Sequence, residues 1–230
     1  MASAGVIDDY VTELRRTLRG PFRLRRDMVT EARDSLADTA DAYHAEGLDR
    51  SEAERLAVAE FGPVGEIAPG YQEELAASQG RRTAAALFVA VPVNTVMWSL
   101  IWRFYPGDEW GPLKPAWFSP LAHFLDVFQF AMGVVGALML LAFTRGPRRL
   151  RRPMMLTRAI GVLLWIQVPA IIGMSAALTY GRGTVLEDTT TFLPGAAASL
   201  FSYAVAGWLL CGATRCLLVT RRAPAPQPAA

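Results

Sequence analysis

Two ionisable side chains, His123 and Asp126, stand inside an otherwise apolar stretch of the sequence. Their spacing of three residues places both on one face of a helix. An ionisable residue inside a membrane span is a functional candidate, here for sensing a stimulus or handling a proton. A carboxylate near the N-terminus of a span, at the wet edge of the bilayer, is also stabilised electrostatically. The structural role is the favoured interpretation, and the functional role stays as the alternative.

The rest of the sequence offers little for catalysis. Its two histidines, His44 and His123, are too few and too far apart for a cluster of metal ligands. The phosphate-binding pattern GxxxxGK[ST] does not occur. The two cysteines, Cys211 and Cys216, share one apolar stretch, which excludes a disulfide framework. We expect no catalytic residue, no metal and no cofactor, and therefore a protein that is not an enzyme.

A cluster of arginines is the strongest polar signal, in the stretch RRTLRGPFRLRRD at residues 15–27. Basic runs of this kind bind nucleic acid or lipid, or they form solvated helix faces. Residues 1–80 carry nine arginines and sixteen acids, so their net charge is 9 − 16 = −7. A domain of that charge repels phosphates, so we predict no nucleic-acid binding. The six arginines are Arg15, Arg16, Arg19, Arg23, Arg25 and Arg26.

Three uses of this cluster remain. The arginines could meet anionic lipid headgroups, because basic side chains near a membrane are attracted to them. They could form ion pairs with an acidic protein partner or with the neighbouring helix. They could also form a plain solvated helix face, which carries about half the weight for any charge run.

Four apolar stretches are long enough to cross a bilayer, which takes about 20 residues of helix. We predict spans at residues 83–102, 121–144, 159–180 and 194–214. The polar Asn94 and Gln167 inside them are expected to face other helices, where a partner is available. In the fourth span, Gly207 with Cys211 and Gly212 with Cys216 predict a face that packs on another helix, and a homo-oligomer stays open.

The orientation follows from the arginines in the connections, because Lys and Arg are retained on the cytoplasmic side. Residues 145–158 read RGPRRLRRPMMLTR and hold six arginines. Arg81 and Arg82 precede the first span, and Arg221 and Arg222 follow the last. We therefore predict a multi-pass protein of the cell membrane, N-in and C-in, with a transmembrane domain at residues 81–222. The Pro-rich end, residues 223–230, is expected to be disordered.

Residues 1–80 carry a helical apolar period, so we predict a helical domain and an all-α fold. Leu14 is expected on the apolar face of the first helix, Leu36 on that of the second, and Leu56, Ala57 and Phe61 on that of the third. Gly20 is expected to end the first helix as a left-handed cap. Before the third helix, either Ser51 with Glu54 or Asp49 with Glu52 offers a capping box. The bundle is small but large enough to fold.

The stretch from Tyr10 to Leu75 resembles permease prefix domain 1, which is similar to the HAAS signalling domain. The residues that carry the resemblance are the arginine-rich turn, the segment EAERLAVAEFG and the segment IAPGYQ, in that order. Relatives often precede membrane spans, and many are encoded beside PadR-type transcriptional regulators. The resemblance implies a helical cytoplasmic module that passes or receives a signal, and it brings no catalytic residues.

We therefore expect an integral membrane signalling protein whose cytoplasmic helical domain docks a soluble partner, of PadR type. The alternative is an accessory or partner subunit of a membrane transport system. A complete permease is disfavoured, because the connection at residues 103–120 holds only eighteen residues where export permeases insert a large domain.

Overall fold

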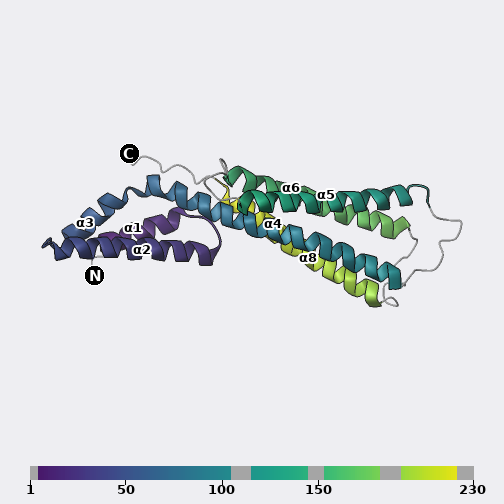
Figure 1. Cartoon of the computed structure of the whole chain (residues 1–230), viewed down its shortest axis with the longest axis horizontal. Helices are drawn as coiled ribbons and strands as arrows, with labels where there is room; N and C mark the ends of the chain where they lie inside the picture. The colour runs from purple at the N-terminus through teal and green to yellow at the C-terminus, as the bar shows by residue number, and fades with distance from the viewer. Residues whose placement is uncertain (1–4, 105–114, 145–152, 182–192, 222–230) are drawn as a thin grey trace. The chain divides into compact units, whose positions relative to one another are not determined.

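The computed structural model describes residues 5–104, 115–144, 153–181 and 193–221, and these residues are helical with no strand among them. This confirms the all-α prediction. The helices are α1 (Val6–Thr17), α2 (Phe22–Ala45), α3 (Arg50–Phe61), α4 (Val64–Phe104), α5 (Phe118–Thr144), α6 (Pro153–Gly181) and α8 (Leu193–Val219) (Figure 1). The predicted tail and most of the arginine-rich connection lie outside the described residues.

The chain divides into two compact units. Unit 1 comprises Met1–Gln79 with Leu218–Ala230, and unit 2 comprises Gly80–Leu217. The helix α4 therefore begins in the first unit and continues into the second.

The core of unit 1 is built from leucines at helical spacing. Leu14, Leu18, Leu36 and Leu75 are almost completely buried, so α1, α2 and α4 all contribute to it. The prediction for Leu36 is confirmed. The prediction for Leu56 is wrong, since its side chain is 40% exposed. The inner face of α3 consists of small residues, Ala53 and Ala57, which let this helix approach closely.

Tyr10 ties α1 to the end of α3. Its hydroxyl donates to the carbonyl of Gly62 at 2.9 Å, and its ring meets that of Phe61 edge-on at 5.9 Å. Burial, with smaller contributions from Tyr71 and Glu13, raises the pKa of Tyr10 above its ordinary value. The hydroxyl therefore stays protonated and keeps donating.

The ends of α1 and α3 are capped in different ways, and the end of α1 differs from the prediction. Helix α1 leaves through Leu18 in an extended conformation, and Gly20 has no positive φ, so the predicted left-handed cap is wrong. Gly20 instead lies against the side chain of Leu75. Gly62, at φ 98°, does end α3 in a conformation that favours glycine. At the start of α3, Asp49 is the N-cap and accepts from the Ser51 N–H at 3.2 Å.

Helix α4 is continuous across the predicted boundary between the N-terminal domain, residues 1–80, and the first span, residues 83–102. Gly80 lies at this boundary but does not break the helix, because a glycine inside a helix costs only about 1 kcal/mol. Gly80 is also the residue that fits there, because neighbouring helices leave no room for a side chain. A Cβ at Gly80 would come within 2.5 Å of Phe143 and Thr157, so α4 passes close to α5 and α6 at this point.

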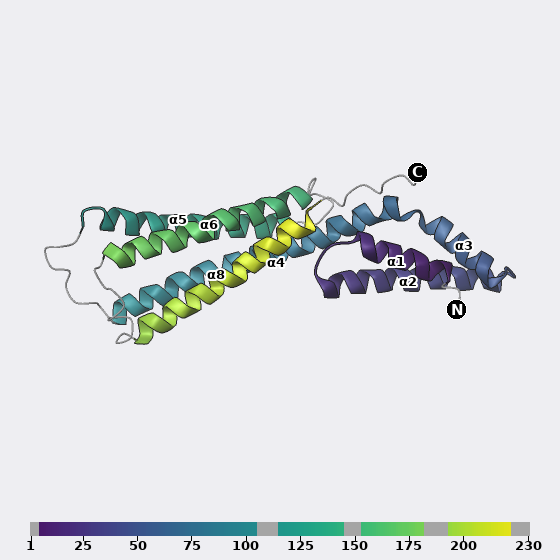
Figure 2. The ribbon, with the colours of Figure 1, turned by 180° about the vertical axis from the view of Figure 1, so that it is seen from behind.

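Unit 2 is a bundle in which α4, α5, α6 and α8 run alternately in opposite directions (Figures 1 and 2). In both views α5 lies beside α6 and α8 lies beside α4. All four helices are long and apolar enough to cross a membrane. Each contains one of the predicted spans and extends it by a few residues, or much further in α4. Together they indicate a multi-pass membrane protein.

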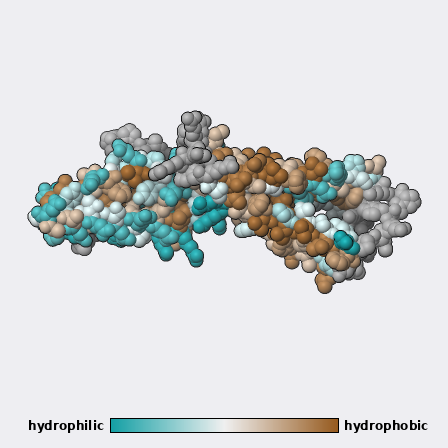
Figure 3. Space-filling view, in the orientation of Figure 1, coloured by the Kyte–Doolittle hydropathy of each residue, from teal (hydrophilic) through white to brown (hydrophobic). Residues whose placement is uncertain are grey.

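Unit 2 carries large apolar side chains on its surface as well as in its core. Leu87, Ile160 and Leu164 are fully buried between the helices, whereas Phe130 and Leu200 are 74% and 72% exposed. Figure 3 shows hydrophobic side chains gathered over the surface of this unit, while the surface of unit 1 is mostly hydrophilic. Exposed side chains of this kind are stable where lipid, and not water, surrounds the helices.

Candidate functional site

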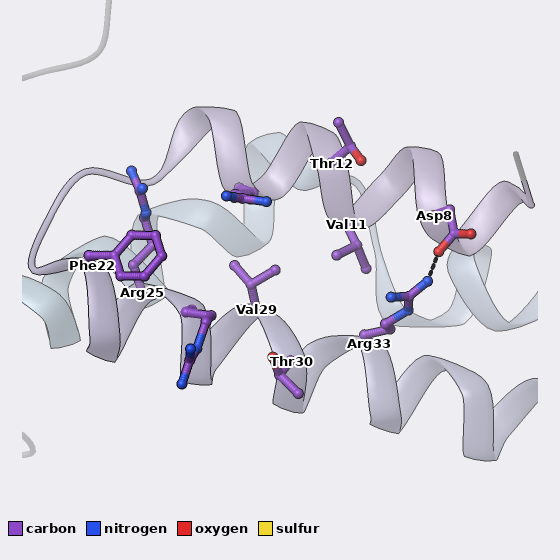
Figure 4. A pocket seen from close by; sticks show the side chains of 10 residues that line it. Asp8, Val11, Thr12, Phe22, Arg25, Val29, Thr30 and Arg33 are labelled. Carbon is purple, nitrogen blue, oxygen red and sulfur yellow. Dashed lines mark hydrogen bonds and ion pairs between the residues drawn. The ribbon is translucent and has the colours of Figure 1, made fainter.

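The candidate site in unit 1 is a groove between α1 and α2 that is lined by charged, polar and apolar side chains. It encloses about 350 Å³ and is formed by residues from two antiparallel helices (Figure 4). Four of its lining residues are arginines. The lining residues are Asp8, Val11, Thr12, Arg15, Phe22, Arg25, Arg26, Val29, Thr30 and Arg33.

The helical repeat places these side chains in two facing rows. On α1 the row runs from Asp8 to Arg15, and on α2 from Phe22 to Arg33, with single residues or adjacent pairs recurring every three or four residues. Residues at this spacing share one helix face. Val29 is buried and Val11 half-buried between the rows, so the floor of the groove is apolar and its rim is polar.

The groove arginines differ in their partners. Arg33 forms an ion pair with Asp8 across the groove (Figure 4). Arg25 donates to the carbonyl of Leu18 at 3.3 Å, which anchors it to the end of α1. Among the residues that the structure describes, Arg26 has one ion pair, an exposed contact of 3.6 Å with its neighbour Asp27. Arg15 has no ion pair among the described residues, so Arg15 and Arg26 remain available for a ligand.

The structure splits the predicted cluster of six arginines. Arg15, Arg25 and Arg26 line the groove. Arg16, Arg19 and Arg23 are exposed but lie outside its lining. Sequence reasoning did not identify Arg33 or Phe22 as part of the same surface, although both follow the helical spacing from Arg26.

Gln72 was also missed, and it holds the turn between α1 and α2, the two helices that carry the groove arginines. Its amide Nε2 donates to the carbonyl of Arg19 at 2.7 Å, and its Oε1 accepts from the Arg19 N–H at 2.8 Å. The same Nε2 lies 2.9 Å from the carbonyl of Val219, which groups with unit 1 at the end of α8. A glutamine on a helix gives no sequence signal for contacts this distant.

His123 and Asp126 lie near the beginning of α5, and both are exposed. Neither makes a hydrogen bond or ion pair within the part of the chain that the structure describes. Their use in sensing or proton handling stays a prediction.

Other polar side chains of unit 2 do meet between helices. Asn94 accepts from the hydroxyl of Ser202 at 2.7 Å, and that hydroxyl accepts from Trp98 Nε1 at 3.1 Å. This confirms that Asn94 faces another helix. Gln167 is only 3% exposed, and its Oε1 has no hydrogen-bond partner in the described residues.

The predicted packing face of small residues on α8 is confirmed for one of its two pairs. Cys216 is fully buried, with its sulfur 3.2 Å from the hydroxyl of Thr83, and Gly212 packs on the same threonine. A Cβ added at Gly207 would meet no described atom within 4 Å, and Cys211 is exposed. Within the described helices, therefore, Gly212 and Cys216 pack on a neighbouring helix and Gly207 and Cys211 do not.

Comparison with known proteins identifies the first unit. Residues 9–70 match the family described as HAAS, and this match covers most of α1, all of α2 and α3, and the start of α4. Every lining residue of the groove except Asp8 lies within the match. No curated protein and no solved structure matches the chain. The chain thus combines a HAAS domain, a protein-interaction module, with four helices of membrane-spanning length.

Proposed function

We propose that the protein is a membrane signalling protein whose HAAS domain lies in the cytoplasm and docks a soluble regulator of PadR type. The observation that carries this proposal is the continuity of α4. One helix of 41 residues contains the end of the HAAS match and the first span without a break. A binding event on the domain is therefore connected covalently, through regular structure, to the membrane part.

The charge distribution supports the cytoplasmic placement. Arginines precede the first span at Arg81 and Arg82 and follow the last at Arg221, where the positive-inside rule predicts the cytoplasmic side. We assign the chain no reaction, and its role in this proposal is to bind and to signal.

The test is purification of the tagged full-length protein in mild detergent, followed by identification of what accompanies it. The proposal expects a soluble regulator of PadR type with the wild type and with Ser35→Asp, which changes an exposed residue. It expects none with Leu36→Asp, which places a charge in the core of the domain. Recovery of transporter subunits in place of a regulator would favour the accessory-subunit alternative.

A further inference from the structure

We propose that the groove between α1 and α2 binds one acidic, amphipathic helix of a protein partner. The inference rests on the proposed function for the existence of a protein partner, and it adds the surface and the chemistry of the contact.

The dimensions of the groove fit a short helix. The α2 row extends from Phe22 to Arg33, a separation of 33 − 22 = 11 residues. At 1.5 Å per residue this is about 16 Å, or three helical turns. The α1 row is shorter, 15 − 8 = 7 residues or about 10 Å, so about two turns of an amphipathic helix would lie between both rows and a third turn would contact the α2 row alone.

The floor of the groove gives that helix something apolar to cover. Phe22, 58% exposed at one end of the floor, and the half-buried Val11 offer this apolar area, while Val29 is buried beneath them (Figure 4). Aromatic side chains are enriched in protein interfaces relative to the rest of the surface. The partner helix should therefore place large aliphatic residues toward the groove.

The rim of the groove selects for acidic residues. Four arginines and one aspartate line it, so its net charge is 4 − 1 = +3. Residues 34–66, which follow the groove in the chain, hold two arginines and nine acids, a net charge of 2 − 9 = −7. An acidic helix is attracted to the groove and repelled by the rest of the domain, which gives both orientation and specificity.

A membrane surface fits the same groove less well. Val29 lies 6% exposed between two rows of side chains, where a flat layer of headgroups does not reach. The negative remainder of the domain also repels an anionic bilayer over a wider area than the groove attracts it. The observations therefore favour the protein helix.

A direct test uses the full chain in nanodiscs of zwitterionic phosphatidylcholine and a fluorescent probe peptide. The probe is a helix of about 18 residues with leucine on one face and glutamate on the other, long enough for the three turns of the α2 row. A second probe has lysine in place of glutamate. The variants are R15Q/R26Q, in the groove, and R55Q, which removes an exposed arginine of α3 outside it.

The glutamate probe should bind the wild type and R55Q, and it should bind R15Q/R26Q about tenfold more weakly, because two charge pairs with the probe are lost. The lysine probe should not bind, and added salt should weaken the glutamate complex. Equal binding to all three proteins would overturn the proposal. So would a double variant that loses only co-sedimentation with phosphatidylserine vesicles, because that result assigns the arginines to lipid.

Photo-crosslinking in cells separates the groove from the proposed function. A crosslinker at Thr30, inside the groove, should capture the regulator, whereas one at Glu52, exposed on α3, should not. Capture at Glu52 alone would retain the proposed function and reject the groove. Probe binding without capture of a regulator at either position would retain the groove and reject the proposed function.

Discussion

The side-chain amide of Gln72 pairs with both main-chain polar groups of Arg19, accepting from its N–H at 2.8 Å and donating to its carbonyl at 2.7 Å. The amide thus satisfies backbone groups that neither α1 nor α2 can satisfy, since Arg19 lies between the two helices. It holds the turn that joins α1 to α2, the two helices that carry the groove arginines.

Replacing Gln72 by alanine should loosen this turn without unfolding the domain. The Arg19 amide loses its acceptor, at a cost of about 1 kcal/mol, which corresponds to about fivefold faster hydrogen exchange at that amide. Hydrogen exchange at Arg19 measures this directly. Glu73→Ala, at the exposed neighbouring position, is the control and should leave the exchange rate unchanged. Equal exchange in both variants would show that the amide pair does not hold the turn.

Leu36→Asp should unfold the helical domain. Leu36 is completely buried, and an unpaired carboxylate there costs more than about 3 kcal/mol, a large share of the stability of a small domain. Limited proteolysis of the full chain should cleave α1 to α3 rapidly in this variant. Ser35→Asp adds the same charge one position away on the exposed side and should resist like the wild type. Resistance of Leu36→Asp would contradict the assigned core.

Two glycines of α4 should respond oppositely to alanine. At Gly70 no atom lies within 4 Å of the added Cβ, so Gly70→Ala should stabilise the helix by up to about 1 kcal/mol. At Gly80 the same methyl group would lie 2.5 Å from Phe143 and Thr157, so Gly80→Ala should destabilise unit 2 despite its better helix propensity. Thermal unfolding in detergent should shift upward for the first variant and downward for the second. Two upward shifts would refute the close approach at Gly80.

The stabilisation that Asp49 gives to the start of α3 should depend on pH. Hydrogen bonds from the Ser51 side chain and N–H lower the pKa of Asp49 below its ordinary value of 3.8. Because the pKa of this carboxyl is lower in the folded than in the unfolded protein, the cap stabilises the fold at pH values above the unfolded-state pKa. This stabilisation is lost as the pH falls through the folded-state pKa. The variant D49N keeps a capping oxygen that does not titrate.

The unfolding temperature of wild type and D49N should be compared between neutral pH and the acidic range below 3.8. The wild type should lose its advantage over D49N as the pH falls, because the remaining carboxyl groups titrate in both proteins alike. A difference between the two that is constant with pH would contradict the role of the Asp49 carboxylate as the cap.

Periodicity predicted the parts of this structure that depend on local sequence. The burial of Leu14 and Leu36 and the four apolar helices follow from one-dimensional patterns, because a repeat near 3.6 residues or a run of about 20 apolar residues has one stable outcome. The continuity of α4 was harder to predict. Gly80 and two arginines suggest a boundary, but only the close packing against Phe143 shows why glycine is placed there.

Contacts between distant residues could not be predicted in this way. Gln72 and Arg19 lie 53 positions apart, and their pairing depends on how α4 packs against the α1 to α2 turn. Leu56 is exposed and Ala53 buried because the close approach of α3 favours a small residue on its inner face. The arginine cluster was visible in the sequence, whereas its division between a groove and an open surface required the two facing rows.

The central claim is that the HAAS domain faces the compartment that holds its soluble partner, and topology reporters test it most directly. A reporter active only in the cytoplasm should work when fused after Arg152, in the arginine-rich connection, and should fail when fused after Gly183. The same reporter at the N-terminus should also work. Activity after Gly183 together with silence after Arg152 and at the N-terminus would place the domain on the other side of the membrane and contradict the account.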